Sequence, residues 1–223
     1  MNGLEALYPF LYPAEQSDAP GDTATLERVL DEVRRSTREK AEEIAALRER
    51  VLATYGEQLA GCATAMAASF AVGGRLFVFG NGGSSTDAQA VAELFLAPDQ
   101  DGPGLPAIAL TADVAVLTAL ANDVSFDVVF ARPLAASARP GDIAVGRSTS
   151  GGSANVLRGL AQARRLGLLT VGLAGYDGGA MAEADNIDHL FVMPSSSVHR
   201  IQEAQTTVYQ VLGELTRLAL RDR

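Results

Sequence analysis

The chain has 223 residues, of which 48% are hydrophobic, and its formal net charge is −9. The acidic balance, the single lysine (Lys40) and the lack of any Lys/Arg block argue against nucleic acid as a partner. One cysteine, Cys62, allows no disulfide framework and no cysteine zinc site, and we expect its thiol to be buried. The apolar run 63–72 is too short to span a bilayer, so we expect no membrane partner and, with no signal peptide in view, a cytoplasmic protein.

Residues 1–24 are predicted to form an N-terminal arm. Residues 8–13 are aromatic and punctuated by proline, whereas residues 17–23 are polar and loop-like. The alternative is a disordered tail. Because aromatic and leucine side chains are costly to leave in water, we expect the arm to pack on its own body or on a neighbouring subunit.

Two helices are predicted to follow the arm. Apolar residues recur at helical spacing over 25–51, and residues 54–72 form a second helix-like segment that ends at Gly73 and Gly74. Helices that precede an α/β core are typical packing elements. They predict an oligomer built through helix bundles.

The rest of the chain alternates short apolar segments with helix-like segments. The predicted strands are 75–79, 107–110, 143–146, 168–174 and 190–193. The predicted helices are 87–96, 114–121, 127–138, 153–166 and 198–220, and Pro133 is expected to kink or interrupt the third of them. Right-handed crossovers between such strands predict an α/β fold, with a doubly wound, five-stranded parallel sheet and helices on both faces.

Two loops that follow predicted strands carry most of the functional signal. One reads Gly-Asn-Gly-Gly-Ser-Ser-Thr at 80–86, and the other reads Ser-Thr-Ser-Gly-Gly-Ser at 148–153. Glycines let the backbone approach a phosphate, the following helix N-terminus points free N–H groups at it, and hydroxyls add donors. Neither loop has the lysine of a nucleotide P-loop or the acidic residue of a dinucleotide fingerprint. Together, at one edge of a parallel sheet, they predict a sugar-phosphate site.

Six motifs in register extend this interpretation. They lie at 80–84, 106–110, 121–123, 148–157, 175–179 and 200–203. Over residues 25–220 the chain resembles the sugar-isomerase (SIS) domain family, and within it the isomerases of seven-carbon sugar phosphates. The resemblance implies a flavodoxin-like strand order, a single SIS domain over residues 25–223 that includes the two N-terminal helices, a homotetramer, and active sites between subunits. It also implies a phosphosugar isomerase that interconverts a ketose phosphate and an aldose phosphate, with sedoheptulose 7-phosphate and a heptose 7-phosphate as the expected pair.

The resemblance also assigns site residues. Phosphate binding falls on hydroxyl side chains of the two loops, namely Ser84, Ser148, Thr149, Ser150 and Ser153. Contacts to sugar hydroxyls fall on Asn81, Asp113 and Gln202. The catalytic carboxylate falls on Glu93, one residue short of the family's spacing from Asp87. Any one of these serines alone is more often a helix cap or turn former, so the assignment depends on the six motifs together.

Two positions depart from the family pattern. Many members carry one histidine three residues after the loop's aspartate and another eight residues after the glutamine of Arg-Ile-Gln-Glu; here these positions are Ala90 and Gln210. In members that hold zinc, both histidines are ligands, together with the glutamate and the glutamine. Glu93 and Gln202 alone make a poor zinc site, so we predict no bound metal and no other cofactor.

Interconversion of a ketose and an aldose needs a general base and a general acid. Glu93 is the predicted base if it is partly buried, and His199 or a water is the second proton carrier. Gln210 can orient a substrate but cannot transfer a proton. A helix-start residue bonded to solvent or backbone is an equally weighted alternative for His199. Tyr209 is a further candidate donor, although core packing is the more common role at its spacing.

Arg147 occupies a strand position that is normally apolar, directly before the second loop. Its side chain could face solvent or a partner subunit, or it could turn along the loop and neutralise a phosphate. The second arrangement is favoured, because an unpaired buried guanidinium is costly.

Three functions stay in competition. A phosphosugar isomerase ranks first. A binding or regulatory SIS protein that kept the pocket and lost catalysis comes second, and Ala90 and Gln210 favour it. A structural or assembly protein ranks last, because it would not need two intact phosphate loops.

Overall fold

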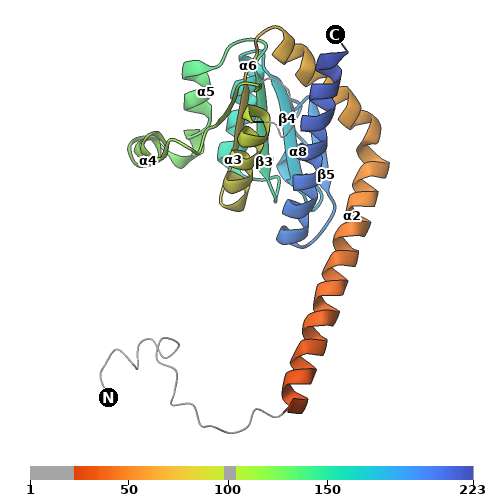
Figure 1. Ribbon diagram of the computed structural model, residues 1–223. Helices are drawn as coiled ribbons and strands as arrows, with labels where there is room; N and C mark the ends of the chain where they lie inside the picture. The colour runs from red at the N-terminus through yellow and green to blue at the C-terminus, as the bar shows by residue number, and fades with distance from the viewer. Residues whose placement is uncertain (1–22, 98–103, 223) are drawn as a thin grey trace, which may run out of the picture. The chain divides into compact units, whose positions relative to one another are not determined.

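The computed structural model describes residues 23–97 and 104–222 (Figure 1). Residues 1–22 of the predicted arm lie outside this part of the chain. The chain divides into two compact units, Met1–Glu42 and Glu43–Arg223. Across the described residues, no helix is both long enough and apolar enough to cross a membrane.

The two predicted N-terminal helices are one continuous helix, α2, which runs over Thr23–Ala71. The predicted break between residues 51 and 54 is wrong because Leu52 and Ala53 are good helix formers and no glycine or proline stands there. The predicted end is confirmed. Gly73 follows the helix with φ of +84°, a left-handed conformation that glycine adopts without strain.

Five parallel strands form one sheet, as predicted. They are β1 (Leu76–Gly80), β2 (Ala107–Ala109), β3 (Ile143–Ser148), β4 (Leu169–Gly175) and β5 (His189–Met193). All neighbouring pairs are parallel, and the strand order is β2-β1-β3-β4-β5. This is the flavodoxin-like order, in which the direction of winding reverses between β1 and β3.

Helices connect the strands. They are α3 (Gly83–Leu96), α4 (Val114–Asp123), α5 (Ala131–Ser137), α6 (Ala154–Arg165), α7 (Gly179–Ala182) and α8 (Val198–Arg221), together with the short 3₁₀ helix η2 (Phe126–Val128). The predicted helix 127–138 is interrupted, as expected, and divides into η2 and α5. Pro133 lies in the first turn of α5, where a missing N–H leaves no helical hydrogen bond unmade.

The core has one layer on each face of the sheet. In β1, Leu76 and Val78 pack with the core residues of α2, α3 and α8, whereas Phe77 and Phe79 pack with those of α5 and α6. Figure 1 shows α3 and α8 running along the strands. Helices on both faces are therefore confirmed, and alternation along each strand explains why the strands read as continuous apolar runs.

Cys62 belongs to the layer that includes α2. Its side chain is fully buried, and burial raises the pKa of the thiol to about 12. The predicted packing role of this residue is confirmed, because a neutral thiol in an apolar layer is inert.

Candidate functional site

Two helices begin side by side at the carboxyl edge of the sheet. Because β1 and β3 are neighbours, the loops that follow them meet where the winding reverses, and α3 and α6 start there. In the part of the chain that the structure describes, neither helix has a side-chain cap, although the hydroxyl at Ser153 occupies the N-cap position of α6. By contrast, Asp113 caps α4 and Ser197 caps α8. Uncapped helix N-termini direct backbone N–H groups toward an anion.

A pair of asparagines ties the two loops together. Asn81 Nδ2 donates to Asn155 Oδ1 at 2.8 Å, and Asn155 Nδ2 donates back to Asn81 Oδ1 at 2.9 Å. Asn155 Oδ1 also accepts the backbone N–H of Val156 at 2.9 Å. The predicted sugar contact Asn81 thus also fixes the distance between the loops. Its partner Asn155 lies inside the motif at 148–157 but was missed, since nothing in a sequence pairs two amides 74 residues apart.

Three serines gather their hydroxyls in the second loop. The Oγ atom of Ser148, which is buried, lies 2.9 Å from Ser153 Oγ and 3.4 Å from Ser150 Oγ. Thr149, which follows Ser148 in the chain, is partly buried. The sequence prediction that these side chains form one cluster of donors is consistent with this geometry, and the ligand itself stays a prediction.

The backbone of the motif at 175–179 packs directly against the backbone of the second loop. Gly151 has φ of +65°, and a Cβ atom there would lie only 1.9 Å from the carbonyl oxygen of Gly178. Gly179 has φ of +50°, and a Cβ atom there would lie 2.3 Å from the carbonyl oxygen of Ser150. Both positions therefore require glycine, and the two backbones hold each other in place.

The first turn of α3 is covered by α8. A Cβ atom on Gly83 would lie 2.2 Å from Gln202 Nε2, so the amide of Gln202 rests on the start of α3 beside the buried Ser84. His199 is exposed in the first turn of α8. Asp113 is exposed after β2, and its Oδ1 accepts the N–H of Val116 at 3.0 Å. These four predicted site residues lie at the carboxyl edge of the sheet, namely Ser84, Asp113, His199 and Gln202.

The predicted catalytic residues Glu93 and Gln210 do not lie at the loops. They line an open cavity of about 460 Å³ between α3 and α8. It is lined by Ala90, Glu93, Leu94, Ala97, Tyr209 and Gln210. Glu93 is exposed in the single chain rather than partly buried. Leu94, one position on, lies on the same helix face as Ala90. The cavity thus holds one carboxylate, one phenol and one amide beside aliphatic side chains.

The structure does not bring all the catalytic candidates together in one chain. On the continuous helix α8, His199 lies eleven residues before Gln210, which is about 16 Å at 1.5 Å per residue. Gln202 lies eight residues before Gln210, about 12 Å away. Within one chain, His199 and Gln202 therefore belong with the loops, whereas Glu93 and Gln210 belong with the cavity.

These residues do not fit a zinc ion. Ala90 supplies no donor, Gln210 offers only a neutral amide, and Gln202 is too far along α8 to reach the same ion. Across residues 23–97 and 104–222, no three His, Cys, Asp or Glu side chains are grouped to hold a metal ion. The absence of a cofactor stays a prediction.

Arg147 adopts an arrangement that was not predicted. Its side chain is 0% exposed and faces α3 and α8, where Nη2 donates to Asp87 Oδ2 at 2.7 Å and to Gln205 Oε1 at 3.0 Å. Its guanidinium carbon lies 5.3 Å from the ring centre of Tyr209. Burial lowers the pKa of Arg147, and the charge of Asp87 opposes that shift. The side chain neither faces solvent nor follows the phosphate loop, because a carboxylate on α3 compensates it in the interior.

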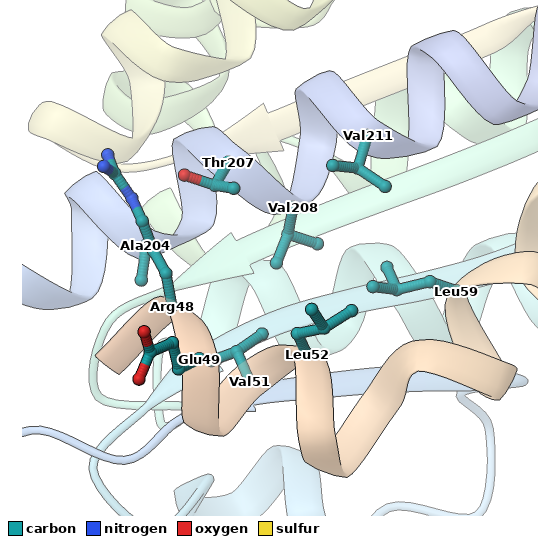
Figure 2. Close-up of a pocket in the computed structure, with 9 residues that line it drawn as sticks. All are labelled: Arg48, Glu49, Val51, Leu52, Leu59, Ala204, Thr207, Val208 and Val211. Atoms are coloured by element: carbon teal, nitrogen blue, oxygen red, sulfur yellow. The ribbon is translucent and has the colours of Figure 1, made fainter. Parts of the chain in front are cut away.

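An aliphatic groove of about 250 Å³ lies between α2 and α8, apart from the loops. Figure 2 shows Val51, Leu52, Val208 and Val211 lining it, with Arg48 among the polar residues beside them. Such a lining suits apolar side chains and not a phosphorylated sugar.

The fold is an α/β domain with its candidate site at the carboxyl edge of a parallel sheet, and comparison with known proteins identifies its family. The SIS domain family matches residues 41–175, and the chain belongs to that family. Phosphoheptose isomerases are among its relatives in that family. The one from Aquifex aeolicus (strain VF5) is 41% identical over 188 residues, which cover 84% of this chain and 95% of that protein. The one from Roseiflexus sp. (strain RS-1) is 39% identical over 210 residues, 91% of this chain and 98% of that protein.

Solved structures agree with the sequence relatives. The phosphoheptose isomerase from Neisseria gonorrhoeae superposes with a TM-score of 0.77 at 30% identity, covering 83% of this chain and 99% of that one. The phosphoheptose isomerase from Francisella tularensis gives the same TM-score and identity, with coverage of 84% and 97%. The predicted family and fold are confirmed.

Proposed function

We propose that this protein is a ketose–aldose isomerase of phosphorylated sugars, with sedoheptulose 7-phosphate and a heptose 7-phosphate as its substrate and product. The observation that carries the proposal is the pair of Gly/hydroxyl loops, fixed to each other by Asn81 and Asn155 at two uncapped helix N-termini. A phosphate fits this arrangement of N–H and hydroxyl donors. The phosphoheptose isomerases at about 40% identity support the seven-carbon substrate.

Isomerisation through an enediol moves one proton between adjacent carbons and one between their oxygens. In the proposed reaction the carboxylate of Glu93 removes the carbon-bound proton and returns it to the neighbouring carbon. His199 or a water carries the proton between the oxygens. Gln202 and Gln210 orient the sugar by hydrogen bonds, since a side-chain amide is neither an acid nor a base near neutral pH.

The active site is proposed to be shared between copies of the chain, in a cytoplasmic homotetramer. In one chain the loops, His199 and Gln202 lie at the start of α3 and α8, whereas Glu93 lies ten residues into α3, about 15 Å from Gly83. A second copy that sets its cavity against the loops would join the two groups and would bury Glu93. The aliphatic groove between α2 and α8 supports an assembly, because such surfaces are typical of contacts between subunits.

Mixed oligomers test this arrangement. Ser150→Glu puts a carboxylate in the phosphate loop at an exposed position, and Glu93→Gln removes the base. Each variant alone should be inactive, and Ser150→Gln controls for size without charge. After co-refolding, a shared site should restore about a quarter of wild-type activity, because one interface in four joins an intact loop to an intact cavity. Mixtures that stay inactive would show that each site lies within one chain.

Isotope exchange tests the chemistry. In deuterated water with sedoheptulose 7-phosphate, the wild type should incorporate deuterium at the carbon next to the carbonyl, and Glu93→Gln should slow this by about a hundredfold. Unchanged exchange in Glu93→Gln would contradict the assigned base. A thermal shift with the same sugar phosphate measures binding separately, because a ligand of the native state raises its stability.

A binding or regulatory role is the second candidate, and one observation favours it. Beside Glu93, the cavity presents a methyl group at Ala90 and an amide at Gln210, where a proton-transferring pair would be expected. Stabilisation by the sugar phosphate without any exchange would establish this role in place of catalysis.

The proposed enzyme works without zinc. Titration of the purified oligomer with zinc should show no binding at submicromolar concentration, and a chelator should leave turnover unchanged. Stoichiometric tight binding would contradict this part of the proposal and would place other ligands beside Glu93.

A further inference from the structure

The N-terminal part of α2 carries an exposed apolar stripe ahead of the residues that the SIS family model matches. The family match begins at residue 41, and the first compact unit ends at Glu42. Inside that unit Leu26, Val29, Leu30 and Val33 lie at spacings of three and four, and between 43% and 58% of each residue is exposed. Aliphatic side chains at this spacing form one face of a helix and are typical of a helix that packs against another.

The charges of the same segment are divided along the helix axis. Residues 27–32 hold three carboxylates and one arginine, whereas residues 34–40 hold four cations and one glutamate. The segment is therefore acidic in its first half and basic in its second. An antiparallel pair of copies sets acidic half against basic half twice, by symmetry, and a parallel pair sets like charge against like charge.

We propose that residues 26–40 of one chain pair with the same residues of a second copy as antiparallel helices. Leu30 and Val33 then lie at the centre of the contact, and Leu26 of one copy lies opposite Thr37 of the other. Glu27 and Arg34 are seven residues apart on the same flank of the stripe, so each Glu27 meets an Arg34 of the other copy. The pairing uses no residue of the sugar-phosphate site, so its test is independent of the proposed chemistry.

The pair is short and is expected to be weak without the rest of the protein. Isolated helices of this length are marginal in water, and few apolar side chains meet. In the proposed homotetramer, on which this step rests, copies held together through their SIS domains would raise the local concentration of the segment and favour the pairing. The test therefore uses the full chain.

Disulfide crosslinking distinguishes the possible alignments. A Leu26→Cys chain and a Thr37→Cys chain of different tag length are mixed, refolded and oxidised, and crosslinked pairs are separated without reductant. Cys62 is fully buried and should stay silent. We expect mixed Leu26→Cys and Thr37→Cys chains to crosslink and Leu26→Cys chains alone not to, because antiparallel helices place residue 26 far from its own copy.

Two controls make the result specific. Arg28→Cys mixed with Arg35→Cys places thiols on the opposite, exposed side of the same helix and should give no crosslink. Leu30→Glu added to the first mixture should lower the crosslinked fraction severalfold at unchanged helix content by circular dichroism. The proposal is overturned if the first mixture does not crosslink, or if Leu26→Cys alone crosslinks equally well.

Discussion

The two edges of the sheet use polar residues in opposite ways. At the amino edge, the carboxylate of Asp142 accepts the backbone N–H of Arg75 at 2.8 Å, the side chain of Arg75 at 2.7 Å and the backbone N–H of Arg139 at 2.8 Å. Asp188 similarly accepts the N–H of Thr170 at 2.9 Å. At the carboxyl edge, the hydroxyls of Ser148 and Ser153 bond mainly to each other, and the helix N-termini beside them are uncapped among the described residues.

This difference separates stability from function. Closed sets of hydrogen bonds around a carboxylate fix the starts of the strands and leave nothing for a ligand to satisfy. Open donors at the strand ends add less to stability and are available to an anion. Changes at the amino edge should therefore lower stability and spare binding, and changes at the carboxyl edge should do the reverse unless they touch the glycines that shape the loops.

Gly151→Val should have the largest effect, because it breaks this division. The new side chain would meet the carbonyl of Gly178, and φ of +65° disfavours a branched residue, so we expect a loss of about 4 kcal/mol of unfolding free energy and no substrate binding. Urea unfolding and a thermal shift with sedoheptulose 7-phosphate measure the two effects. Gly152→Ala is the stability control, since its Cβ would meet nothing nearer than 3.7 Å. Equal stability of both variants would contradict the prediction, because it would show that the loop backbone rearranges to accommodate the valine side chain.

Asp142→Ala should lower the free energy of unfolding by about 3 kcal/mol. The folded molecules should keep the turnover number of the wild type. The substitution leaves Arg75 and two backbone N–H groups without their acceptor in a buried place. Glu39→Gln breaks the exposed pair with Arg35 and should leave the free energy of unfolding nearly unchanged, because water and salt screen exposed charges. Urea unfolding compares the two variants. A large fall in turnover per folded Asp142→Ala molecule would contradict the separation of the edges.

Acid should weaken the amino edge of the sheet through protonation of Asp142. Burial acts to raise the pKa of Asp142, but the hydrogen bonds from Arg75 and Arg139 outweigh it and lower the pKa below the ordinary value. A lowered folded pKa stabilises the protein above the unfolded value, near pH 4, and this contribution disappears as the pH falls through the folded pKa. The stability difference between wild type and Asp142→Asn, measured by urea unfolding from pH 7 to pH 3, should therefore shrink toward acid. A constant difference would contradict the assignment.

The sequence was sufficient for the fold and for the parts of the site that are local in the chain. Apolar segments predicted the five strands to within about two residues, and the segments at 80–86 and 148–153 lie at strand-to-helix junctions as predicted. The helix after the first of them begins four residues earlier than predicted, so that residues 83–86 form the first turn of α3. Contacts between distant residues were not visible. The burial of Arg147 depends on Asp87, 60 residues away, and the split between the loops and the cavity of Glu93 depends on the straight course of α8. Patterns in sequence report neighbours in the chain, and these features are set by neighbours in space.

The smallest predicted effect tests whether Asp113 contributes to the site or only to α4. As an N-cap its loss should cost about 1 kcal/mol, and Ser197→Ala removes the matching cap of α8 at the same cost. If Asp113 also holds a sugar hydroxyl, as predicted from the resemblance, Asp113→Ala should raise KM for sedoheptulose 7-phosphate about tenfold, since one hydrogen bond to a charged group contributes about 1.5 kcal/mol. Ser197→Ala should leave KM within about twofold, because the resemblance assigns no sugar contact to Ser197 and its hydroxyl serves as a cap, accepting the backbone N–H of Arg200. Equal KM values for the two variants would show that Asp113 only caps α4. The carboxyl edge would then consist of capped helices with a structural role, α4 and α8, and uncapped helices that bind the ligand, α3 and α6.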